Sequence, residues 1–175
     1  GGRILIDSRD GNTLVDKNAV IDVSAGLVSG NGGFIEVSAF DQLGFYGVLN
    51  GRAPPGYQIG TAILDPTNAS IGNPPPLDEP NGICGTTFNA NTTVWATNNI
   101  TIVGNVTIWN GVTLTLLADH NETFPGSGVF VWDNGEGSIT RSGAFTISGG
   151  TSGTRTLIMK AGSGIGTSST PILTD

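Results

Sequence analysis

Apolar residues alternate with small or polar residues in short runs along most of the chain. Each run is four to six residues long and ends at Gly, Asn, Asp or Pro, as in residues 3–7, 34–39 and 61–65. This period of two is typical of β-strands that bury one face. No stretch shows the apolar spacing of three and four residues that an amphipathic helix requires. The pattern therefore predicts an all-β chain.

Several of these runs align with one another residue by residue. The aligned sets are GGRILIDS (1–8) with GGFIEVSA (32–39) and IGTAILDP (59–66), then 19–24 with 47–52, 100–108 with 139–147, and 114–119 with 157–162. Like segments that recur in the same order, at drifting spacing, indicate equal strands joined by loops of unequal length. Stacking like on like favours in-register parallel sheets, and so predicts a parallel β-helix (solenoid) rather than a meander or a two-sheet sandwich.

Pro66 marks the expected corner of each coil. It directly follows the strand-like run that ends at Asp65, and a proline cannot donate a hydrogen bond to a sheet. Asp7 and Ser38 occupy the same column as Asp65 in the alignment, so we expect every coil to turn at this position. The alternation also predicts the core, formed by Ile4, Ile6, Ile35, Val37, Leu64, Ile102, Ile108, Leu114, Leu116, Ile147, Leu157 and Met159.

The domain organisation follows from the length and from one break in the pattern. The 175 residues predict one domain, a single β-helix segment (1–175) of a longer chain, because both ends lie in strand-like runs. Residues 72–91 contain four prolines and no alternation, and they are expected to form a Pro-rich insertion loop extruded from the solenoid.

Charge and cysteine content exclude some partners. Lys and Arg number 7 against 14 Asp and Glu, which gives a net charge of −7 without any basic cluster. Because phosphate neutralisation needs basic side chains, we expect no nucleic-acid partner. The single cysteine, Cys84, cannot form an internal disulfide and is a candidate intermolecular thiol.

Three stretches carry a resemblance to a known family. They are NGGFIEVSAFDQLGFYGVLNGRA (31–53), GTAILDPTNASI (60–71) and AGSGIGTSSTPILT (161–174). In this order they resemble the filamentous-haemagglutinin-like exoproteins (adhesins) of bacterial two-partner secretion. The resemblance implies a right-handed parallel β-helix, secretion through an outer-membrane pore, and an extracellular place on the bacterial cell surface. It also implies an adhesive or fibre-forming structural role without catalytic residues.

A polysaccharide-degrading β-helix enzyme, either a lyase or a hydrolase, is the alternative function. Such a site needs neighbouring carboxylates or an Asp cluster that binds calcium. Most of the acidic residues that could serve lie far apart in the sequence, namely Asp22, Glu36, Asp65 and Asp119. Only Asp78 with Glu79 and Asp133 with Glu136 are close in sequence, and both pairs fall in Pro/Gly turns. His120 has no second His or Cys at ligand spacing. We therefore expect no catalytic residue, no cofactor and no metal, whereas a cleft with two close carboxylates would favour the enzyme.

Two further patterns concern glycans and partners. Five sites match Asn-x-Ser/Thr, and Asn68, Asn91 and Asn121 are the better glycosylation candidates because we expect them in turns or loops. Trp95, Trp109 and Trp132 are expected to stack inside the solenoid, with contact to a glycan as the alternative. The expected partners are neighbouring coils or copies of the chain end to end, the secretion pore, and a host or community surface glycan or protein.

Overall fold

The computed structural model describes residues 1–72, 82–83, 88–119, 137–141, 147–149, 154–162 and 164–165. Across these residues the chain forms β-strands and no helix, which confirms the all-β prediction. All strand pairs within the described part are parallel.

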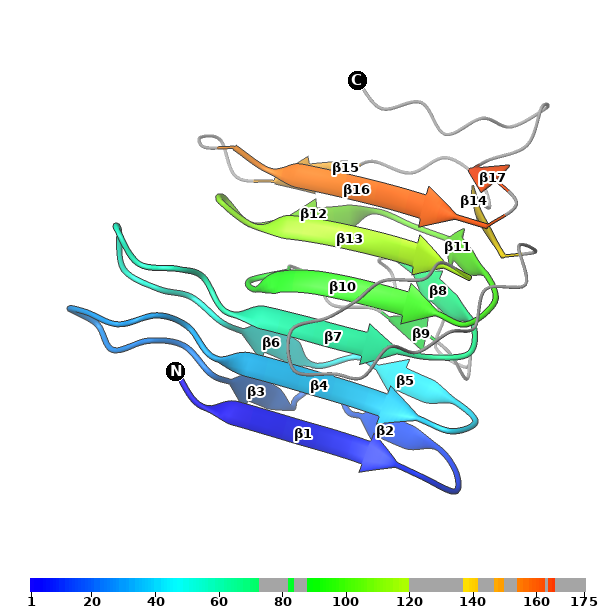
Figure 1. The fold of residues 1–175 in the computed structure, drawn as a ribbon, viewed down its shortest axis with the longest axis horizontal. Helices are drawn as coiled ribbons and strands as arrows, with labels where there is room; N and C mark the ends of the chain where they lie inside the picture. The colour runs from blue at the N-terminus through cyan, green and yellow to red at the C-terminus, as the bar shows by residue number, and fades with distance from the viewer. Residues whose placement is uncertain are drawn as a thin grey trace.

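The largest aligned set of strands forms one six-stranded sheet in which strand order follows chain order (Figure 1). Its strands are β1 (Arg3–Ser8), β4 (Phe34–Ala39), β7 (Thr61–Asp65), β10 (Asn91–Ala96), β13 (Thr113–Ala118) and β16 (Thr156–Ala161). The pairing of Arg3 with Phe34, and of Phe34 with Thr61, confirms the register predicted from the sequence. The pairing of Leu114 with Leu157 confirms it for the last aligned set.

The remaining strands lie behind this sheet in Figure 1. The seven-stranded sheet contains, in spatial order, β17 (Gly164–Ile165), β14 (Ser138–Arg141), β11 (Ile100–Ile102), β8 (Ala69–Ile71), β9 (Gly82–Ile83), β5 (Leu43–Phe45) and β2 (Thr13–Val15). Two-stranded sheets pair β3 (Val20–Asp22) with β6 (Val48–Asn50) and β12 (Val106–Ile108) with β15 (Ile147–Gly149). Parallel bridges from Asn50 to Asn89 and from Phe88 to Ile108 link these two small sheets.

The apolar side chains at alternating strand positions meet in one core between the sheets. The predicted core residues that are fully buried are Ile35, Val37, Leu64, Ile102, Ile108, Leu114 and Leu116. Those that pack against this core but keep some exposure are Ile4, Ile6, Leu157 and Met159. The side chain of Ile147 lies outside the described set. Each buried Leu or Ile side chain contributes roughly 1.5–3 kcal/mol, so this shared core is the main source of stability.

One predicted pairing has a different register. Ile100 pairs with Ile139 as expected, but Val106 rather than Ile108 pairs with Ile147. The connection between β14 and β15 is two residues longer than the one between β11 and β12. Because the shift is two residues, the period-two alternation of the two strands stays in phase.

The prediction that residues 72–91 form an extruded loop is wrong for part of this segment. Gly82 and Ile83 form β9, and Ile83 is 1% exposed where it pairs with Phe45 and Ile71. The apolar side chain of Ile83 joins the core, which explains why this short piece returns to the sheet. Asn91 opens β10. Phe88, Asn89 and Ala90 are also buried, and the bridges of Phe88 and Asn89 tie them to the small sheets. For residues 73–81 and 84–87 the prediction lies outside the described residues.

A glycine precedes β4 because two chain segments approach closely there. The N–H of Gly33 donates to the carbonyl of Val23 at 2.7 Å. A Cβ atom on Gly33 would contact the carbonyl oxygen of Gly2 at a distance that side chains do not tolerate. A Cβ atom on Gly2 itself would meet nothing within 4 Å. The position before β4 therefore requires glycine, and the one before β1 does not.

We expect Gly33→Ala to lower the free energy of unfolding by about 1–3 kcal/mol, because the backbone must shift to admit the methyl group. Gly2→Ala is the matched control and should leave stability nearly unchanged. Urea denaturation followed by circular dichroism measures both. Equal stability of the two variants would contradict the close approach of Gly33 to Gly2.

Candidate functional site

The turns that join the six-stranded sheet to the seven-stranded sheet stack on one another and form one corner of the molecule. The first three of them are residues 9–12 after β1, 40–42 after β4 and 66–68 after β7. The Phe40 N–H donates to the Ser8 carbonyl at 2.9 Å, which ties the second turn to the end of β1. We call these three turns the carboxyl-end corner, because they follow the carboxyl ends of the strands.

Pro66 begins the third of these turns, as predicted. Its carbonyl accepts a hydrogen bond from the Thr97 N–H at 3.2 Å, so the turn stays connected to the next strand although the proline donates none. Asp7 pairs with Ser38, and Ser38 pairs with Asp65. The strands β1, β4 and β7 thus end within one residue of one another.

A hollow of about 500 Å³ opens at this corner. The residues that line it are Asn12, Phe40, Asp41, Gln42, Thr67 and Asn68. Its origin is a mismatch between the two sheets. In the six-stranded sheet β4 and β7 are neighbours, whereas in the seven-stranded sheet β9 separates β5 from β8. The turns 40–42 and 66–68 must therefore diverge by about one strand spacing, roughly 4.8 Å.

The hollow combines an aromatic ring with amide and hydroxyl groups. Phe40 is 70% exposed, which is high for a large apolar side chain. The Asn68 side-chain oxygen accepts a hydrogen bond from the Asn99 N–H at 3.2 Å, so its amide is held in position. Amides and hydroxyls both donate and accept hydrogen bonds, and a ring face offers apolar contact. Sugar rings present the complementary surfaces, hydroxyl edges and C–H faces.

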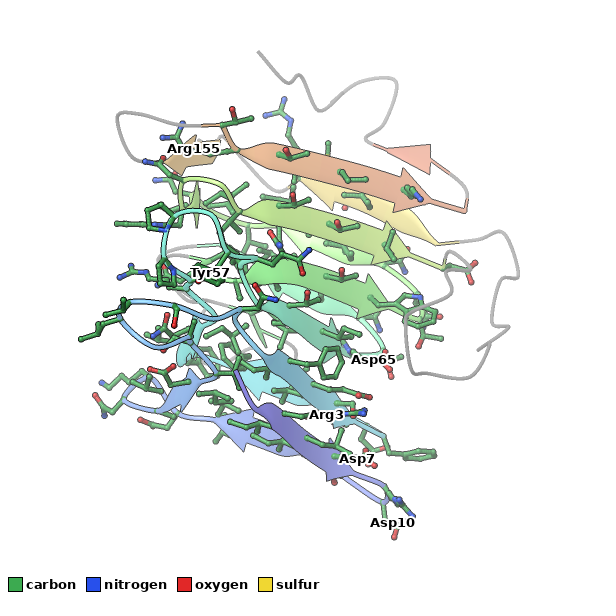
Figure 2. The ribbon with its side chains drawn as sticks, turned by 60° about the vertical axis from the view of Figure 1, so that its left-hand side comes forward. Arg3, Asp7, Asp10, Tyr57, Asp65 and Arg155 are labelled. Carbon is green, nitrogen blue, oxygen red and sulfur yellow. The ribbon has the colours of Figure 1, made fainter. Side chains whose placement is uncertain are left out.

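Carboxylates lie beside the hollow on the outward face of the six-stranded sheet. Asp7 and Asp65 occupy the same column on β1 and β7, with Ser38 between them (Figure 2). Two strand spacings separate them, about 10 Å between backbones. The Ser38 hydroxyl donates to Asp7 Oδ1 at 3.3 Å, and Arg9 Nε lies 3.4 Å from Asp7 Oδ2. Glu36 adds a third carboxylate on β4, 3.9 Å from the Arg3 guanidinium.

The environment of Asp65 favours its protonated form. Burial raises the pKa of this carboxyl from 3.8 to about 6, and the negative charges of Glu36 and Asp7 act in the same direction. The parallel register accounts for the contribution of the two charges, because it places these side chains on one face of three successive strands. The sequence analysis aligned Asp7 with Asp65 but missed this cluster, since the two lie far apart along the chain.

The glycosylation candidates have different positions. Asn68 lies in a turn, as expected, and lines the hollow. Asn91 does not lie in a turn. It is the first residue of β10, and its side-chain oxygen accepts a hydrogen bond from the Thr113 N–H at 2.9 Å. The third candidate, Asn121, and the thiol candidate, Cys84, lie outside the described residues.

Trp109 is partly exposed rather than stacked inside the fold. The ring is 42% exposed, and the Arg52 guanidinium lies 4.2 Å from its centroid. Arg52 also donates to the side-chain oxygen of Asn89 at 3.2 Å. This cation–π contact lies near the small sheets rather than at the carboxyl-end corner. His120 and Trp132 lie outside the described residues.

Within the described part of the chain, no group of three or more His, Cys, Asp or Glu side chains is arranged to hold a metal ion. The same residues include no helix of the length and apolar character needed to cross a membrane. Comparisons with protein-family models, with curated proteins and with solved structures found no match to this chain. The corner residues therefore have to be interpreted from their own chemistry.

The raised pKa of Asp65 leads to a pH-dependent stability. Its folded pKa exceeds the unfolded value, so the native state binds more protons and stability falls as pH rises from about 4 through about 6. We expect Asp65→Asn to raise the free energy of unfolding at pH 7 on the order of 2 kcal/mol after allowance for solvent screening, and to have little effect below pH 4.

Asp10→Asn, in an exposed turn beside the same corner, is the control and should change stability by less than about 0.5 kcal/mol. Denaturant titrations at several pH values measure both variants. A gain for Asp65→Asn that is the same at pH 3.5 and pH 7 would contradict the assigned cause.

Proposed function

We propose that the chain is a right-handed parallel β-helix segment of an exported bacterial surface protein of the filamentous-haemagglutinin-like kind. Its role is adhesive or structural and not enzymatic, and its ligand is a surface glycan of a host or community cell. Secretion through an outer-membrane pore and a place on the bacterial surface belong to the same proposal and rest on the resemblance of residues 31–53, 60–71 and 161–174.

The strand order supports the β-helix. Successive strands of the six-stranded sheet are parallel, in register and ordered as in the chain, and strands of the other sheets intervene between them. A chain that returns to the same sheet in this way advances by one strand at each return, which is the path of a β-helix. Crossovers between parallel strands are right-handed in about 98% of cases, which supports the handedness.

The hollow at the carboxyl-end corner is the observation that carries the adhesive role. A regular parallel stack has flat walls, and this concavity brings together the exposed ring of Phe40 and the polar groups of Gln42, Thr67 and Asn68. Binding sites typically combine an apolar contact with a few placed polar groups. A glycan is the ligand class that this mixture fits, because each sugar ring offers both kinds of surface.

The enzyme is retained as a second candidate because of Asp7 and Asp65. Their backbones lie two strand spacings apart, roughly 10 Å, and inverting glycosidases place two carboxyl groups roughly 6.5–9.5 Å apart. The raised pKa of Asp65 suits a general acid. The position of Ser38 argues against catalysis. Its hydroxyl donates to Asp7 from the strand between the two carboxylates, where a glycosidic bond would have to lie.

We expect Phe40→Ala to weaken glycan binding by roughly tenfold, because one aromatic contact is lost. The fold should be unaffected, since the ring is mostly exposed. Leu27→Ala is the control, because Leu27 is fully exposed in the connection before β4 and does not line the hollow. A glycan array selects the probe, and calorimetry with the selected oligosaccharide gives the affinities of all three proteins.

The same oligosaccharide separates the two candidate functions. Unchanged chain length after prolonged incubation supports adhesion. Cleavage products that disappear in Asp7→Asn and Asp65→Asn would support the enzyme instead. Absence of binding to any glycan, or equal binding by Phe40→Ala and the unaltered chain, would refute the assigned site.

A further inference from the structure

Several asparagines of this chain are followed directly by glycine, a pair that can react with itself. The pairs within the described residues are Asn31 with Gly32, Asn50 with Gly51 and Asn110 with Gly111. In the reaction the backbone nitrogen of the glycine attacks the side-chain carbonyl carbon of the asparagine. Glycine has no Cβ and reaches the backbone conformations for this attack most easily. The fold therefore decides which of these pairs has the freedom to react.

Two of the pairs are packed tightly against neighbouring backbone. Gly51 is buried, and a Cβ atom on it would lie 2.9 Å from the side chain of Ala90. A Cβ atom on Gly32 would collide with the backbone of Gly51 and of Gly60. The N–H groups of Gly32 and Gly51 also donate to carbonyls of neighbouring segments. Neither glycine can turn toward its asparagine without displacing the chain that packs on it.

The third pair, Asn110 with Gly111, occupies a tight turn at the surface. The N–H of Val112 donates to the carbonyl of Trp109 at 3.1 Å, and Gly111 has a φ of 77°, as in the third position of a type II turn. Gly111 is exposed, and its N–H donates to the carbonyl of Thr154 at 2.8 Å. Release of this hydrogen bond lets the nitrogen of Gly111 move toward Asn110, because the glycine borders solvent.

Arg155, which directly precedes β16, contacts the side chain of Asn110; Figure 2 labels this arginine. Its Nη2 donates to Asn110 Oδ1 at 2.7 Å. A charged donor at this oxygen stabilises the oxyanion that forms when the adjacent carbon is attacked. At Asn31 and Asn50 the same oxygen accepts from an uncharged backbone N–H group. The charged donor thus distinguishes Asn110 from the other two.

The guanidinium of Arg155 also has an unused donor. Its Nε is buried and has no hydrogen-bond partner among the described residues, which is costly for a buried polar atom. The second polar atom of an asparagine side chain is an NH2 group, which cannot accept from Nε. A carboxylate has two accepting oxygens and pairs with arginine through two parallel N–H groups. The surroundings of Arg155 therefore fit an aspartate better than the asparagine that the sequence contains.

We propose that Asn110 is a site of spontaneous deamidation, at which the side-chain amide becomes a carboxylate that pairs with Arg155. The Gly111 nitrogen forms a bond to Asn110 Cγ and gives up its proton, the Cγ–Nδ2 bond breaks, and ammonia leaves with that proton. Water then opens the cyclic succinimide. Opening at Cγ gives aspartate, and opening at the backbone carbonyl gives isoaspartate.

The product adds one negative charge and ties the turn 109–112 to the start of β16 by an ion pair. The reaction consumes only water and involves no change of oxidation state. It uses no residue that lines the hollow, so it is independent of glycan binding.

Mass spectrometry of the ageing chain tests the site. The full chain is incubated at mildly alkaline pH, and the peptides that contain Asn31, Asn50 and Asn110 are quantified over time. In the folded chain Asn110 should convert roughly tenfold faster than the other two, because they are packed and lack the charged donor. In concentrated urea the rates should become similar. An intact Asn110, or earlier conversion of Asn31 or Asn50 in the folded chain, would overturn the proposal.

Arg155→Met tests the part played by the guanidinium. It should slow the conversion of Asn110 roughly tenfold, because the charged donor to Oδ1 is lost, and leave Asn50 unaffected. Arg52→Met is the matched control, since Arg52 stacks on Trp109 beside the same turn but donates to Asn89. This control should convert Asn110 at the unaltered rate. An equal or higher rate in Arg155→Met would overturn the role of Arg155.

Asn110→Asp tests the product directly. Arg155 should lower the pKa of the new carboxyl, so its stabilisation is present above the unfolded pKa and is lost as pH falls through the folded pKa. The thermal midpoint should therefore exceed that of the unaltered chain at about pH 7 and match it at about pH 2. The gain should vanish when Arg155→Met is added. Asn31→Asp is the control and should give no gain that depends on Arg155. A midpoint that does not rise, or rises without Arg155, would overturn the pairing.

Discussion

Parallel, in-register hydrogen bonding between β1, β4, β7, β10, β13 and β16 is the constraint on which the rest of this structure depends. It aligns equivalent positions of successive strands, so each inward column becomes a continuous ladder of side chains. Most positions in the inward columns are apolar, because a continuous ladder between the sheets is shielded from water. Thr92 is a polar member of an inward column, at 1% exposure, and its hydroxyl donates to the Ala90 carbonyl at 2.9 Å. A buried polar group is tolerated because it is hydrogen-bonded.

The same constraint places carboxylates in columns, where their hydrogen bonds and their burial decide the direction of the pKa shift. Asp22 meets Asn50, whose amide donates to it at 2.9 Å. Hydrogen bonds from Ser24, and a smaller contribution from Asn50, lower the pKa of Asp22. Asp65 is instead partly buried near Glu36 and Asp7, and its pKa rises. Hydrogen-bond donors thus stabilise a carboxylate in this fold, whereas burial, reinforced by neighbouring carboxylates, destabilises one.

The sequence predicted what repeats along the chain and missed what does not. The columns of Arg3 and Leu114 were predicted correctly because the strands are long enough to show alternation. β9 was missed because Gly82–Ile83 is two residues long and lies among prolines, too short to show any period. Asn91 was predicted in a turn or loop but is the first residue of β10. The preceding Pro-rich segment shows no period, so nothing in the sequence marks where β10 begins. The shifted pairing of Val106 with Ile147 depends on the length of the connection between β14 and β15. The alternation of residues along a strand gives no information on that length.

The missed strand is also the reason that the hollow exists. A stack in which every sheet advanced by one strand per return would have corners of constant spacing and no concavity. Insertion of β9 into one sheet alone separates the turn 40–42 from the turn 66–68, and Phe40 and Asn68 then line the opening.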